Sequence, residues 1–286
     1  MESRNEKIYS GRRIGEIYRM LSEIKKHLKI YAHLVKVSAM QQMEYRVNFI
    51  LAIIVECTWV ILKSLYVFIT QKTGGIIGGS TPDEIMLFIG TFMILTAIYI
   101  GLFSGGFNYI SWGVRNGEFD MLIPKPVSLQ FISTMRWLSI SVPIPNIIAG
   151  VILISIAWDR IGLSAGIINI FLYIYLIFCG ILVAYSILII PHILSFWTVK
   201  TYQIAEISYR LWDFNNMPMQ IYNKWWQRAG IFLIPVFVIT NFPVMALFNN
   251  LPPLYLIWGI IIPVILFLMV RLFWKFAIKR YSSAGG

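Results

Sequence analysis

Long apolar runs separated by short polar segments dominate the chain. Six runs reach the roughly 20 residues that a helix needs to cross a bilayer, and they cover residues 46–70, 86–110, 137–158, 167–197, 229–248 and 254–273. Pro143 and Pro145 break the start of the third run and leave backbone groups that another segment must satisfy. The pattern predicts an all-α polytopic membrane protein with six transmembrane helices.

A different pattern precedes the first run. Within residues 12–40, lysine and arginine residues surround one apolar stripe at alternating spacings of three and four, formed by Ile14, Ile17, Leu21, Ile24, Leu28, Tyr31 and Val35. A basic amphipathic helix of this kind lies in the membrane interface, and a helix packed on a soluble partner shows the same pattern. We assign residues 1–44 to a cytoplasmic N-terminus with an amphipathic interfacial helix, 45–276 to the transmembrane domain and 277–286 to a tail.

The distribution of basic residues predicts the orientation. With the N-terminus inside, all but three of the 24 lysine and arginine residues fall in cytoplasmic segments, the exceptions being Lys63, Lys72 and Arg160. This bias follows the positive-inside rule. It places both termini in the cytoplasm, together with a segment at 113–128 and a second loop at 198–228. The net charge of +11 is then explained by topology, so we expect the lipid bilayer and no nucleic acid as a partner.

Composition narrows the chemistry. Charged residues make up 13% of the chain, against about 25% in an ordinary soluble domain. Neither the two cysteines nor the three histidines have the spacing of a metal site, and no Walker motif is present. We expect no catalytic residues, no metal and no cofactor in this chain. A membrane-embedded enzyme such as an acyltransferase would need an interfacial His, Asp or Cys cluster, which the sequence lacks.

Ionisable residues inside apolar runs are costly and often functional. Glu56 and Lys63 lie seven residues apart, on one face of the first run. Lys63 can reach the headgroups from near the outer end, whereas Glu56 faces either a translocation cavity or a neighbouring helix. The candidates for a translocation path are Glu56, Asn146, Phe242 and Pro243.

Small residues in the second run indicate close helix packing. Ala97, Gly101 and Gly105 recur every four residues, a spacing that lets helix backbones approach each other. The pattern fits packing inside one chain and packing between two copies equally well, so it leaves the oligomeric state open.

The stretch RNGEFDMLIPKPVS, residues 115–128, is unusually polar for a connection between two apolar runs. Pro124 and Pro126 end any helix that begins near Gly117. We therefore predict a short helix over residues 118–123 and then an extended exit. Such a compact knob suits docking into a cytoplasmic partner. The alternative is an ordinary loop of a secondary transporter or a membrane scaffold protein.

This stretch resembles the motif between the second and third helices of type-2 ATP-binding-cassette (ABC) export permeases, in particular those of the bacterial daunorubicin-type branch. The residues that match are Arg115, Gly117, Asp120, Leu122 and Phe131. The sequence departs from the pattern where Met121 precedes the leucine and where the prolines are closer together. Residues 217–248 are similar to the start of the branch's fifth helix, and residues 279–286 to its basic C-terminal end. The resemblance thus covers nearly the whole chain.

The resemblance implies the permease subunit of an ABC exporter in the bacterial plasma (inner) membrane. Such a chain would pair with a second permease chain, identical or related, and with two copies of a separate ATPase subunit that binds ATP and magnesium. It would move a hydrophobic or amphipathic substrate out of the cytoplasm. The ATPase-coupling residues implied are Arg115, Gly117, Glu118, Phe119, Asp120, Leu122, Pro124 and Pro126.

Overall fold

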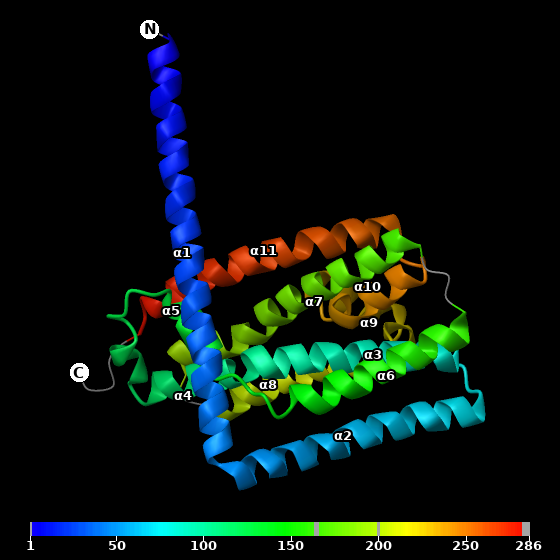
Figure 1. The fold of residues 1–286 in the computed structure, drawn as a ribbon. Helices are drawn as coiled ribbons and strands as arrows, with labels where there is room; N and C mark the ends of the chain where they lie inside the picture. The colour runs from blue at the N-terminus through cyan, green and yellow to red at the C-terminus, as the bar shows by residue number, and fades with distance from the viewer. Residues whose placement is uncertain (1, 163–165, 199–200, 282–286) are drawn as a thin grey trace.

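The computed structural model describes residues 2–162, 166–198 and 201–281, and within them the fold is all-α. The long helices run side by side (Figure 1) and comprise α2 (Arg46–Thr73), α3 (Pro82–Tyr99) continuing into α4 (Gly105–Arg115), α6 (Pro143–Ile161), α7 (Ile167–Ile193) and α11 (Pro253–Ile278). The shorter helices are α5 (Leu129–Met135), α8 (Thr201–Asp213), α9 (Lys224–Arg228) and α10 (Phe237–Leu247). Five helices of the described part are long and apolar enough to cross a membrane. The polytopic all-α class is therefore confirmed.

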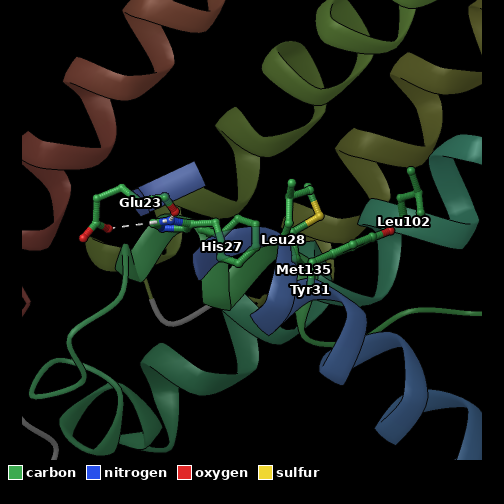
Figure 2. A pocket seen from close by; sticks show the side chains of 7 residues that line it. Glu23, His27, Leu28, Tyr31, Leu102 and Met135 are labelled. Carbon is green, nitrogen blue, oxygen red and sulfur yellow. Dashed lines mark hydrogen bonds and ion pairs between the residues drawn. The ribbon is translucent and has the colours of Figure 1, made fainter. Parts of the chain in front are cut away.

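Helix α1 (Glu2–Glu44) lies across one end of this bundle, and its N-terminal half projects beyond it (Figure 1). We call this end the knob end, because the short helix Glu118–Met121 also lies there. Farther along its length, α1 packs on the segment around α5: the ring of His27 meets that of Phe131 edge-on, 5.0 Å between centroids. Figure 2 shows His27 and Leu28 of α1 facing Met135 at the end of α5. The helix expected before the first span is present as one continuous element.

The connection before α6 relies on α1 for its hydrogen bonds. Gln42 donates through Nε2 to the carbonyl oxygen of Leu138 at 2.6 Å and accepts from the backbone N–H of Ile140 at 2.9 Å. The Ser38 hydroxyl donates to the carbonyl oxygen of Arg136 at 3.2 Å. Helix α6 begins only at Pro143, where the missing N–H costs nothing. Side chains of α1 thus satisfy backbone groups of the connection just before the two prolines.

Close packing within one chain explains the small residues of the second run. The helix continues from α3 to α4 through a π-helical turn, Ile100–Ser104, and the N–H of Ser139 donates to the carbonyl oxygen of Gly101 in that turn at 2.9 Å. A Cβ added at Gly105 would lie 2.4 Å from the carbonyl oxygen of Trp137, and one at Gly106 would lie 2.0 Å from that of Thr134. Side chains there would force the two segments apart.

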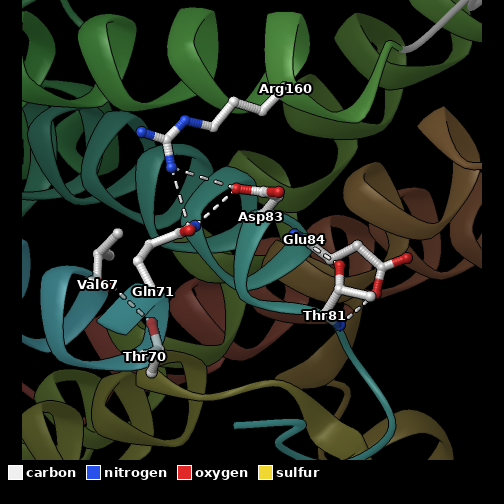
Figure 3. Close-up of polar contacts among 7 residues, drawn as sticks. All are labelled: Val67, Thr70, Gln71, Thr81, Asp83, Glu84 and Arg160. Atoms are coloured by element: carbon white, nitrogen blue, oxygen red, sulfur yellow. Dashed lines mark hydrogen bonds and ion pairs between the residues drawn. The ribbon is translucent and has the colours of Figure 1, made fainter. Parts of the chain in front are cut away.

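The opposite end of the bundle is held by polar contacts among α2, α3 and α6 (Figure 3). Gln71 donates through Nε2 to Asp83 at 2.6 Å, and Arg160 donates to the side-chain oxygen of Gln71 at 3.1 Å. Thr81 and Glu84 form a capping box that starts α3, an arrangement that satisfies two exposed backbone N–H groups. This network fixes the α2–α3 turn beside the end of α6.

The segment 198–228, predicted as a cytoplasmic loop, does not stay at the knob end. Gly78 belongs to the turn between α2 and α3, and a Cβ added to it would lie 3.1 Å from both Cβ of Gln220 and the backbone nitrogen of Ile221. Phe196, shortly before α8, instead packs on Phe119 at the knob end. The chain from Phe196 through α8 to Gln220 therefore runs from one end of the bundle to the other, and 198–228 contains the helix Thr201–Asp213 where a loop was expected.

The predicted fifth span, 229–248, is also not a straight crossing. Residues Lys224–Leu233 and Phe237–Leu247 meet at an angle of 104°. Pro235 causes the break, because it lacks an N–H and forces Ile234 out of the helical region, to φ −125° and ψ 88°. Gln220, just before this pair of helices, and Asn250, just after it, line the same cavity as Gly78. The α9–α10 pair thus enters and leaves from one end of the bundle.

Candidate functional site

The knob, residues 115–126, is shaped by one glycine and two prolines. Gly117 has φ +71° and precedes the helix Glu118–Met121; this left-handed conformation is costly for any residue with a side chain. The helix is two residues shorter than the predicted 118–123. The N–H of Ile123 then bonds back to the carbonyl oxygen of Phe119 at 2.9 Å, before Pro124 and Pro126 prevent further helix.

Buried side chains anchor the knob to the bundle. Phe119 is fully buried, and its ring packs against aromatic rings from α4, from the end of α7, from α11 and from the segment after α11, namely Tyr109, Phe196, Trp274 and Tyr281. Leu122 is also buried, in a cluster with Tyr109 and Ile132. These two predicted coupling residues therefore point into this chain, away from any partner, and they hold the knob in place.

Polar contacts add to this anchoring. The hydroxyl of Tyr109 donates to the Glu118 carboxylate at 3.0 Å and accepts from Arg136 at 3.4 Å. On the other side of the knob, burial raises the pKa of Tyr281, and the neighbouring Asp120 carboxylate raises it further. The knob thus contacts α4, α11, the Phe196 segment and Tyr281 directly, and Arg136 reaches it only through Tyr109.

The tip of the knob is exposed. Met121 is 68% exposed and Ile123 is 51% exposed, so two apolar side chains reach the surface of the knob. The other exposed residues of the knob are Arg115, Asn116, Asp120, Pro124, Lys125 and Pro126. The predicted coupling residues therefore divide into an anchored set and an exposed set, and the exposed set surrounds two apolar side chains that the sequence did not single out.

Helix α8 packs between the long helices of the bundle and carries a polar surface. One face of α8 is buried: Ser208 donates to the carbonyl oxygen of Leu188 at 3.0 Å, and Trp212 stacks on Phe92 and Tyr99. The other face is exposed and carries Gln203, Ile207, Tyr209, Arg210 and Asp213. Charged side chains at the centre of a bilayer cost about 2.5–3.5 kcal/mol each against lipid. This face of α8 is therefore suited to a water-filled path or to another protein chain.

Helix α2 brings Glu56 and Lys63, the charged residues in its middle part, toward α6 and α3. The Lys63 ammonium lies over the ring of Phe92, 4.7 Å from the centroid, and that ring in turn stacks on Trp212 of α8. Glu56 lies two turns before Lys63 on the same face of α2 and accepts a hydrogen bond from Asn146 of α6. The predicted path residue Glu56 thus belongs to the same region of the molecule as the polar face of α8.

The family comparison matches most of the chain. The family described as ABC-2 family transporter protein matches residues 57–285, a range that includes the knob, α8 and all the later helices. The chain belongs to the ABC-2 transporter family. No curated protein and no solved structure matches it. As a family member it is a permease-type membrane subunit, and the family implies association with an ABC ATPase.

The predicted path residues of this ABC-2 family member form two separate groups. Asn146, fully buried on α6, donates through Nδ2 to Glu56 of α2 at 2.5 Å, so this pair joins two helices. Phe242 instead stacks on Tyr255 with its ring centroid at 5.6 Å and packs against Gly259 of α11. Pro243 is buried beside it. The structure does not bring Phe242 and Pro243 together with Glu56, and both are part of the packed interior.

Sequence reasoning missed α8 as part of the candidate site. Its 13 residues are too few, and its exposed face too polar, for a search based on apolar runs of about 20 residues. The available signal was its amphipathic period, with Ser208 and Trp212 on one face and charged residues on the other.

Proposed function

We propose that the chain is the membrane-spanning permease subunit of an ATP-driven ABC exporter. It pairs with a second permease chain, identical or related, and with two copies of a separate ATPase subunit, which bind ATP and magnesium. The membrane is the bacterial plasma (inner) membrane, with both termini and the knob in the cytoplasm. The basic residues support this orientation, because they remain concentrated at the knob end after α8 is placed as a crossing segment.

The knob is the proposed docking element for the ATPase. The observation that carries this proposal is the pairing of an exposed apolar tip, Met121 and Ile123, with a fully buried anchor, Phe119, in the same short segment. An ATPase that grips the tip and moves would transmit the movement through Phe119 to α4, α7 and α11. In physical terms, ATP binding to the partner would bias a permease with two arrangements.

The polar faces of α2 and α8 are the proposed boundary of the translocation path. They are the surfaces where Glu56, Lys63, Arg210 and Asp213 combine with exposed aromatic groups such as Tyr209. A second permease chain facing this surface would enclose it and keep the charges away from lipid. The mixture of apolar and polar groups suits a hydrophobic or amphipathic substrate. The finer resemblance, to the daunorubicin-type branch, stays a prediction that rests on residues 115–131 and 217–248.

The test is to change the tip of the knob and leave its anchor intact. Met121→Arg and Ile123→Arg place a bulky charge where the structure has an exposed apolar side chain. The matched control is Ile76→Arg, because Ile76 is 72% exposed in the α2–α3 turn at the opposite end. Each tagged variant is purified from its native membrane in mild detergent, and soluble P-loop ATPase subunits that co-purify are measured by mass spectrometry.

We expect the wild-type chain and Ile76→Arg to retain a near-stoichiometric ATPase and the two knob variants to lose it. If no ATPase accompanies the wild-type chain in several detergents, the exporter proposal fails and a secondary transporter or a scaffold takes its place. If the ATPase accompanies all four proteins equally, the exporter proposal stands and the assignment of the knob fails.

A further inference from the structure

A groove opens between α1 and the bundle at the knob end. It consists of two cavities of about 620 Å³ and about 330 Å³ that share His27, Phe131 and Met135 in their walls. Figure 2 shows the first cavity, with Leu28 and Tyr31 of α1 on one side and Leu102 on the other. The groove therefore runs from beneath α1 into the space between α7 and α11.

The walls of the groove are mostly apolar. The larger cavity is lined by Leu28, Leu102 and Met135. The smaller one continues past Phe103 and Leu182, side chains that lie about half-way along their long helices. Leu268 and Leu272, on the neighbouring surface of α11, are 56% and 67% exposed. Lipid next to α11 would therefore have an apolar route into the groove.

One basic side chain stands at the polar edge of the groove. Arg271 of α11 donates to the side-chain oxygens of Ser128 and Gln130 at 3.2 and 2.9 Å, and Gln130 donates to the hydroxyl of Tyr185 at 3.0 Å. Among the described residues, the ion pairs of the chain do not include Arg271, and the hydrogen bonds of its guanidinium there go to neutral groups. Arg271 is exposed, and a guanidinium held by neutral groups has N–H donors arranged to bind a phosphate.

Glu23, the carboxylate among the residues that line the two cavities, already has basic partners. Glu23 lines the larger cavity but lies 3.7 Å from the ammonium of Lys26 and 3.9 Å from His27. It belongs to α1, whereas Arg271 lies in the wall of the smaller cavity on α11. The charge at that end of the groove is therefore positive.

We propose that this groove binds an anionic phospholipid from the leaflet at the knob end. An acyl chain occupies the apolar space past Met135, Phe103 and Leu182, and the headgroup phosphate bonds to Arg271. The depth agrees with this assignment, because Arg271 lies in the last third of α11, near the level where α1 crosses the bundle. The proposal rests on the membrane placement of the helices and does not depend on the ATPase partner.

The test compares lipid binding by full-length chains in detergent, using native mass spectrometry. Phosphatidylglycerol and phosphatidylcholine with identical acyl chains are added separately to wild type and to Arg271→Gln. The control is Arg280→Gln, another arginine of the same end, whose guanidinium lies over Phe276 outside the groove. A third variant, Met135→Trp, fills the apolar space that both cavities share.

We expect wild type and Arg280→Gln to prefer phosphatidylglycerol and Arg271→Gln to lose that preference by about tenfold, because a charge-assisted hydrogen bond disappears. Met135→Trp should weaken both lipids and leave their ratio unchanged. The proposal is overturned if Arg271→Gln keeps the preference, or if Met135→Trp binds both lipids as wild type does. Either result would show that the groove does not bind an anionic phospholipid through Arg271 and the apolar space at Met135.

Discussion

The division of the knob into anchor and tip predicts opposite behaviour for two neighbouring residues. Phe119→Ala removes a fully buried ring that contacts four aromatic side chains. Substitutions of this kind lower the free energy of unfolding by about 3–5 kcal/mol. Met121→Ala removes a side chain that is 68% exposed, so we expect a change within about 0.5 kcal/mol.

These values translate into a measurable difference in thermal stability. For a chain of this size, 1 kcal/mol shifts the unfolding midpoint by roughly 2–4 °C. Phe119→Ala should therefore unfold on the order of 6–20 °C below wild type in the same detergent, followed by tryptophan fluorescence, whereas Met121→Ala should unfold with wild type. Met121→Ala should capture less ATPase although its thermal stability equals that of wild type. Phe119→Ala should lose thermal stability. Equal midpoints for Phe119→Ala and wild type would refute the anchoring role.

Three further predictions concern packing, the α2–α6 pair and topology. Gly106→Val should lower the unfolding midpoint strongly, because even a Cβ would lie 2.0 Å from the carbonyl oxygen of Thr134, whereas Gly166→Ala, with nothing within 4 Å, should not; similar midpoints would contradict the close packing of α4 on α5. Glu56→Gln should keep the free energy of unfolding within about 1 kcal/mol of wild type, since its amide oxygen still accepts from Asn146, but Glu56→Leu should lower it by about 1–3 kcal/mol, because the buried Asn146 amide keeps only its bond to the carbonyl oxygen of Val142; no difference between the two would show that the pair is unimportant. Gln220→Cys, in a chain with its native cysteines replaced, should react with an impermeant maleimide from outside intact cells; reaction only after lysis would restore a cytoplasmic loop there.

The fold was predictable wherever an apolar run and a helix coincide. Helices α2, α6, α7 and α11 follow the hydrophobic pattern, and Pro143 marks the start of α6 as its chemistry requires. The prediction failed where one helix is amphipathic and the next is broken. The polar exposed face of α8 predicts a loop, and the apolar residues 229–248 predict a straight span. Pro235 breaks this run through its missing N–H and its effect on Ile234, a local signal that the apolar pattern alone does not contain.

The candidate site was predictable in position but not in detail. The polar stretch with Gly117 and the two prolines identified the knob, because those residues determine local backbone conformation. The direction of each side chain was not accessible in the same way. Phe119 turns inward because Phe196, Trp274 and Tyr281, all distant in sequence, meet beneath it. Likewise, Phe242 seemed suitable for a path but is enclosed by α11, a contact that no local pattern records.

The most direct test of the account is site-specific photo-crosslinking from the knob. A photoreactive amino acid replaces Met121 at the exposed tip or, as the control, Ile76 at the opposite end of the bundle. Both proteins are irradiated in native membranes, and the crosslinked products are identified by mass spectrometry. The account predicts a P-loop ATPase attached at position 121 and none at position 76. Crosslinking of the ATPase from position 76 alone, or of other proteins only from position 121, would contradict the proposal that the knob couples this permease to ATP.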